Sequence, residues 1–338
     1  MPFVEAITKL RSLSIVGMAK NAGKTETLNY ILGRLADYPS LSVAVTSIGI
    51  DGEKEDQVTQ TAKPEITLSP GTLFVTAESY YRRKMLPAEV CDIDTRIATP
   101  IGRAIYARAR GKGKILLAGP SSNLGLRLIV ERMKELQVDL TIIDGALSRM
   151  SLASPSVAEG IVLATGASFS AHPDTLIRGT KALYRLIKLP ALEDPFIIDQ
   201  LSDVENEIYL LGEDNKLYPT GYSSALMMEA WEALAKEVKA KALFIPGVVT
   251  DTMLKRLQSK EIPMLLVKDF TRIYATPQGV ASFFATGKDI KVLYATKLMA
   301  ITFNPQAPNG YKLHSEAVCQ RLQEELGIPV YDVRRIKM

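Results

Sequence analysis

A short stretch near the amino terminus carries the residue types that bind phosphate groups. The segment SIVGMAKNAGKT runs from Ser14 to Thr25, with an apolar run ending at Gly17 and a helical spacing of leucine and isoleucine after it. Such a strand, loop and helix bring together backbone N–H groups, the positive end of a helix dipole and a lysine charge. The segment therefore predicts a phosphate-binding loop, and the alternative is a glycine-punctuated structural turn.

The loop supplies most of the expected nucleotide contacts. We expect these from Asn21, Ala22, Gly23, Lys24, Thr25 and Glu26. Lys24 would reach the β- and γ-phosphates as a catalytic charge, and the Thr25 hydroxyl would hold Mg²⁺. One feature departs from the usual pattern of four residues between the glycines, because Gly17 and Gly23 enclose five, MAKNA. Met18 therefore stands where the first glycine normally does.

Two aspartates follow apolar runs in the way that magnesium ligands do. Asp144 comes directly after LTII, and Asp51 follows VAVTSIGI with Glu53 close behind. Since phosphoryl transfer depends on electrostatic positioning, we expect Asp51 and Asp144 to serve as catalytic and metal-associated carboxylates, with Glu53 as a further candidate. The alternative for Asp144 is an Asp-Gly turn or a helix cap.

Other polar segments permit fewer conclusions. Ser121, Ser122 and Asn123 precede a helical pattern, where capping of that helix is favoured over contact with a ligand. His172 is isolated and is expected to be structural or exposed. No Asn-Lys-x-Asp sequence of the guanine-reading type occurs, which favours ATP as the nucleotide.

Composition limits the classes of protein. The chain has 338 residues and a net charge of +4, and its most basic stretch, Arg108–Lys114, is expected to be a solvated loop, so we predict no nucleic-acid partner. We expect no membrane partner, because no run of about 18 apolar residues occurs. The N-terminal residues lack the apolar core of a secretory signal, and the two cysteines lack a metal-ligand spacing. These features predict a cytoplasmic protein.

Apolar runs alternate with helical patterns along the first half of the chain. The expected strands are 14–16, 42–47, 72–76, 114–118, 140–143 and 160–164, and the expected helices are 25–37, 125–136 and 175–187. This alternation predicts an α/β fold with a mainly parallel, doubly wound sheet. Together with the loop it predicts a P-loop NTPase domain over residues 1–189, which ends at the linker-like sequence KLPALEDP.

The pattern restarts after the linker and predicts a second, smaller α/β domain over residues 190–338, able to bind a partner. Its expected strands are 196–198, 207–211, 243–245, 264–267, 292–303 and 330–333, and its expected helices are 224–238, 251–259 and 315–326. Within it, ITFNPQAPNGYKLHSEA contains Asn304 and Tyr311 in a polar turn. We expect this turn to be either a docking loop or a plain connection.

Two resemblances narrow the function. The five-residue spacing of the loop resembles that of dethiobiotin synthetase and the cobyrinic acid amidotransferases. The segments SIVGMAKNAGKTETLNYIL, TSIGIDGE, IIDGALSRMSLASP, IVLATGAS and ITFNPQAPNGY resemble the ATPase subunit of the lysine 5,6-aminomutase reactivase.

The second resemblance implies an ATPase that uses ATP and Mg²⁺ to release damaged cobalamin from a lysine 5,6-aminomutase. It also implies a second reactivase subunit, resembling mismatch-repair ATPases, as a partner. The alternatives are an ATP-dependent carboxylate ligase or amidotransferase of the dethiobiotin synthetase type, and a binding module that is switched by a nucleotide.

Overall fold

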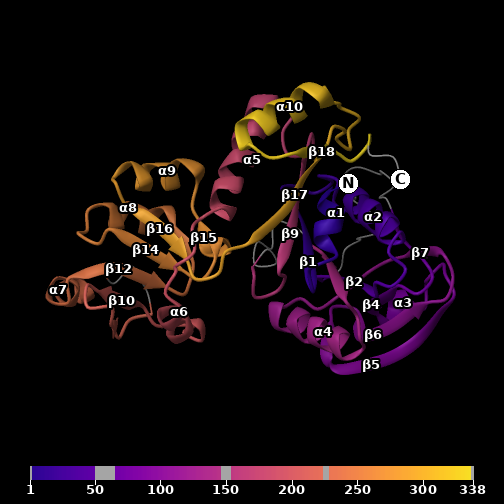
Figure 1. The fold of residues 1–338 in the computed structure, drawn as a ribbon, viewed down its shortest axis with the longest axis horizontal. Helices are drawn as coiled ribbons and strands as arrows, with labels where there is room; N and C mark the ends of the chain where they lie inside the picture. The colour runs from indigo at the N-terminus through magenta and orange to yellow at the C-terminus, as the bar shows by residue number, and fades with distance from the viewer. Residues whose placement is uncertain (1, 50–64, 146–153, 224–227, 336–338) are drawn as a thin grey trace. The chain divides into compact units, whose positions relative to one another are not determined.

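The computed structural model describes residues 2–49, 65–145, 154–223 and 228–335 (Figure 1). Its chain divides into two compact units. The first unit comprises Met1–Lys181 together with Lys297–Met338, and the second unit comprises Ala182–Thr296. Among the described helices, none has both the length and the apolar character needed to cross a bilayer.

The first unit is built on a nine-stranded sheet in the order β18-β17-β9-β1-β8-β2-β4-β6-β5. Neighbouring strands from β18 to β4 pair in parallel, and β6 and β5 complete the sheet in antiparallel fashion. The strands are β1 Ser12–Gly17, β2 Val43–Ser47, β4 Leu73–Ala77, β5 Ala88–Thr99, β6 Gly102–Ala109, β8 Leu140–Asp144, β9 Gly160–Gly166, β17 Lys297–Asn304 and β18 Val330–Asp332. A separate antiparallel pair joins β3, Ile66–Leu68, to β7, Gly113–Ile115.

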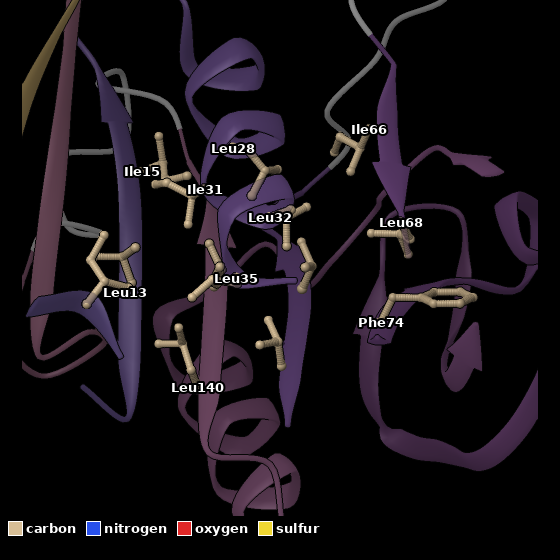
Figure 2. Packing of buried hydrophobic residues seen from close by; sticks show 14 of the residues in the cluster. Leu13, Ile15, Leu28, Ile31, Leu32, Leu35, Ile66, Leu68, Phe74 and Leu140 are labelled. Atoms are coloured by element: carbon tan, nitrogen blue, oxygen red, sulfur yellow. The ribbon is translucent and has the colours of Figure 1, made fainter. Parts of the chain in front are cut away.

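Helices cover both faces of this sheet. They are α1 Pro2–Ile7, α2 Lys24–Leu35, α3 Glu78–Tyr81, α4 Asn123–Glu135 and α10 Ser315–Leu326, while α5, Pro173–Ile187, begins in this unit. Successive strand residues point to opposite faces, so Val43 and Val45 pack in one cluster with α2 and Ala44 packs in another with α4. Figure 2 shows the α2 side of this core, where the helix packs against β1, β3, β4 and β8. The α/β expectation is thus confirmed as a mixed, mostly parallel sheet.

One local expectation in this unit is wrong, and one element lies where no element was predicted. Residues 88–109 form the antiparallel ribbon β5–β6 at one edge of the sheet. The expected strand 114–118 is the short β7, which pairs with β3 outside the large sheet. Exposed residues dominate β5, so its pattern lacks the continuous apolar run of a buried parallel strand.

The second unit has its own five-stranded sheet, in the order β11-β10-β12-β14-β16, in which β12, β14 and β16 are parallel. Its strands are β10 Tyr209–Gly212, β11 Leu217–Pro219, β12 Ala240–Ile245, β14 Met264–Val267 and β16 Asp289–Val292, with the small pair β13 Val249–Thr250 and β15 Ile273–Tyr274. Its α-helices are α6 Pro195–Ser202, α7 Met228–Glu237, α8 Asp251–Gln258 and α9 Pro277–Ala285, and a short 3-10 helix, η2, spans Phe270–Arg272.

One strand expected in this unit is a helix. Residues 196–198 lie in α6, because Asp194 caps its first turn by accepting from the Phe196 and Ile197 N–H groups. Pro195 at the first position favours a helix start further, since its fixed φ suits the helix and its missing N–H costs nothing there.

The boundary between the units differs from the expected division at residue 189. Residues 297–338, expected in the second domain, return to the first sheet, where β17 pairs with β9 and β18 pairs with β17. The expected strand 292–303 is in fact two strands, because β16 ends at Val292 in the second unit and β17 begins at Lys297 in the first. An apolar run indicates a buried strand but not the sheet that it joins.

Candidate functional site

The loop between β1 and α2 has the backbone geometry of an anion site. Helix α2 begins at Lys24, and its N-cap, Gly23, has left-handed angles with φ 99°. Asn21 also has a positive φ, of 63°. The first N–H groups of a helix have no acceptor within it, and glycine offers no side chain to cap them. These donors and the helix dipole can therefore receive an anion at the carboxyl end of β1.

Gly17 and Met18, at the start of the loop, make different contacts. A Cβ on Gly17 would lie 2.8 Å from Cγ of Lys24, so the lysine stem runs back across this glycine. Met18 is 7% exposed, and its N–H donates to the Ala164 carbonyl at 2.9 Å. Gly17 therefore provides the space that the lysine needs, while Met18 attaches the start of the loop to β9.

Asp144 lies at the carboxyl end of β8, between β1 and β2. Its partners in register are Ile15 and Ser47, and it is 1% exposed. Because β1 is the next strand, Asp144 and the loop start from the same edge of the sheet.

The other predicted contacts have different outcomes. Ala22 is buried, and Thr25 lies in the first turn of α2. The Glu26 carboxylate forms an ion pair with Arg334 at 3.2 Å, so its backbone N–H, rather than its acidic side chain, suits an anion. Asp51 and Glu53 lie outside the described residues.

The polar segments left open by the sequence are resolved in part. Ser122 is the N-cap of α4, and its hydroxyl accepts from the Gly125 N–H at 3.1 Å. The preference for capping is thus confirmed at this residue. His172 is exposed.

The structure places beside the loop a residue, Asn304, that the sequence assigned to the second domain. Asn304, at the end of β17, is 5% exposed and its amide donates to the Asn21 carbonyl at 3.3 Å. A Cβ on Gly23 would lie only 2.9 Å from the Asn304 Cβ. The Asn304 side chain is therefore buried against the loop, and the docking role considered for this turn stays a prediction. Tyr311 donates instead to the Ala171 carbonyl.

Among the described residues no group of three or more histidine, cysteine, aspartate or glutamate side chains lies close enough to hold a metal ion. A Mg²⁺ ion bound with a nucleotide needs fewer protein ligands, because phosphate oxygens and water complete its shell. A threonine hydroxyl at the helix start and one buried carboxylate at the neighbouring strand end fit that smaller ligand set.

Neither a scan against protein-family models nor a search of curated proteins finds a match to this chain. The chain is therefore described by its fold as an α/β protein. Its largest sheet is mixed and mostly parallel, and a glycine-containing loop and the N-terminus of α2 follow the end of β1.

Replacing Gly23 with alanine is expected to weaken nucleotide binding by at least about tenfold, which corresponds to a loss of about 1.4 kcal/mol of binding free energy. The new Cβ would meet Asn304 at 2.9 Å and would occupy a left-handed conformation. Gly71→Ala is the matched control, since Gly71 has φ 88° with nothing within 4 Å of its Cβ position. Both variants should lose stability in thermal unfolding, and only Gly23→Ala should lose affinity for ATP in titration calorimetry. Equal affinities in the two variants would contradict the assignment of the loop.

Proposed function

We propose that this chain binds ATP with Mg²⁺ at the loop between β1 and α2 and hydrolyses it. One observation carries the proposal. Lys24 is the first residue of α2, and its side-chain stem passes back across Gly17 at the end of β1. A lysine held there adds its charge to that of the helix dipole, which suits the β- and γ-phosphates of a nucleotide.

The remaining roles follow from position. Backbone N–H groups of Gly23, Lys24 and Thr25 would bind phosphate oxygens, and the Thr25 hydroxyl and Asp144 would hold Mg²⁺, the latter directly or through water. The metal, when bound, neutralises charge that develops on the phosphates. Asp51, which follows β2 in the chain, remains a candidate for a second carboxylate near the site.

We further propose that hydrolysis serves to remodel a partner, as in the ATPase subunit of a lysine 5,6-aminomutase reactivase. The support for this step is the sequence resemblance. The compact second unit, Ala182–Thr296, is a separate body of chain that could engage the aminomutase or a second subunit related to mismatch-repair ATPases. ATP-dependent ordering of loops near the γ-phosphate would then drive release of damaged cobalamin.

The test compares hydrolysis by the purified chain alone with hydrolysis in the presence of the aminomutase and second subunit. We expect Mg²⁺-dependent binding of ATP, slow basal phosphate release, and a faster rate when the partners are added, because docking completes the catalytic arrangement. Failure to bind ATP would remove the nucleotide site. Binding with turnover of a carboxylic acid, and no response to the aminomutase, would favour the ligase.

A further inference from the structure

We propose that β17 holds the phosphate loop in its binding conformation and that Asn304 is the positioning residue through which it does so. This inference rests on the proposed nucleotide site. It assigns a role to a strand that reaches the loop only after the chain has passed through the whole second unit.

The backbone of Asn304 is itself held firmly. Asn304 is in register with Gly166 of β9, and its carbonyl accepts from the Ala167 N–H at 2.9 Å. Any Cβ on Gly166 would lie 2.4 Å from that carbonyl oxygen, so the two strands approach closely only because residue 166 is glycine. A side chain that starts from such a fixed backbone can act as a rigid support.

The Asn304 amide connects this support to the loop. Its Nδ2 donates to the Asn21 carbonyl at 3.3 Å, and its Oδ1 accepts from the Gln306 N–H at 3.2 Å. Asn21 has left-handed angles, which cost energy for a residue with a Cβ and persist only when the surroundings hold them. On the other side of the same peptide, the Ala22 N–H donates to the Ala19 carbonyl at 3.3 Å.

A second contact comes from the same face of β17, two residues earlier. The Thr27 hydroxyl donates to the Gly23 carbonyl at 2.9 Å and lies 2.9 Å from the Thr302 hydroxyl. Because a hydroxyl has one proton, Thr302 is the donor in that pair. The Gly23 carbonyl is thereby held toward the helix, and the Lys24 N–H of the same planar peptide points the opposite way.

Together these contacts hold the Asn21 carbonyl toward β17 and the Gly23 carbonyl toward Thr27, whose hydroxyl Thr302 of β17 supports. The N–H groups at the start of α2 are then already oriented before an anion arrives, which spares the ordering cost of binding. Loss of the Asn304 amide should therefore weaken binding of the polyphosphate part of the nucleotide, whatever base is attached.

The experiment compares Asn304→Ala with Asn309→Ala in the full-length chain, using ATP and inorganic tripolyphosphate as separate probes. Asn309 is a matched control, since its Oδ1 also accepts from an N–H two residues on, that of Tyr311 at 3.1 Å, yet it is exposed. We expect Asn304→Ala to bind both probes about tenfold more weakly, or about 1.4 kcal/mol. Asn309→Ala should bind both as the wild type does.

Thr302→Val provides a second variant that keeps the shape of the side chain, should Asn304→Ala fail to fold. We expect an equal loss of about threefold for both probes, within the range for one neutral hydrogen bond. Asn304→Ala affinities equal to those of Asn309→Ala would overturn the inference, as would a loss for ATP alone, which would place Asn304 on the nucleoside. A wild-type chain that binds neither probe would instead remove the proposed nucleotide site itself.

Discussion

Lys24→Ala is expected to reduce ATP hydrolysis by about 10²–10³-fold, the scale for losing one preorganised charge-stabilising group. The side chain crosses Gly17, where a Cβ would come within 2.8 Å of its Cγ, so its path toward the phosphates is set by the backbone. Alanine removes the only positive side chain that the motif assigns to the β- and γ-phosphates. Affinity for ATP should fall as well, which titration calorimetry would measure beside phosphate release.

Lys134→Ala is the control for this loss of charge. Lys134 is exposed in the last turn of α4, on the face of the sheet opposite to α2. Its replacement changes the net charge equally and should leave both turnover and ATP affinity at the wild-type level. Equal turnover in Lys24→Ala and Lys134→Ala would mean that the loop is a structural turn.

Asp144→Asn is expected to lower Mg²⁺-dependent turnover by about 10²-fold or more, because a bound metal contributes several kcal/mol of charge stabilisation. Asparagine keeps the shape of a side chain that is 1% exposed, and it removes the charge that would attract the cation. ATP affinity measured without Mg²⁺ should stay close to that of the wild type. The measurement is phosphate release as a function of Mg²⁺ concentration, where the variant should need more metal.

Asp139→Asn is the matched control at the opposite end of the same strand. Asp139 immediately precedes β8, and its carboxylate accepts from the Ser42 N–H at 2.8 Å, which an asparagine oxygen can also do. This variant should keep the wild-type Mg²⁺ dependence. If Asp144→Asn also keeps it, Asp144 belongs to the turn after β8 and not to a metal site.

The strand, loop and helix around Lys24 could be predicted from the sequence because they depend on neighbouring residues. An apolar strand, a glycine at the N-cap and a helical spacing after Lys24 are local features, and the same holds for Asp144 at the end of an apolar run. The sequence also showed that Met18 stands where the first glycine of such a loop is usual, but it did not show which contacts Gly17 and Met18 make. Only the packing showed that Gly17 makes room for the lysine and that Met18 binds to the neighbouring strand.

The α/β class, the loop after β1 and the position of Asp144 at the end of β8 could be predicted from the sequence, since backbone preferences and side-chain periodicity act over a few residues. The sheet that each strand joins could not be predicted in this way. β16 and β17 are separated by four residues, yet they belong to different sheets, because strand pairing is settled by hydrogen bonds and burial between distant segments. For the same reason only the folded chain places Asn304 beside Asn21, 283 residues earlier, where its amide donates to the Asn21 carbonyl.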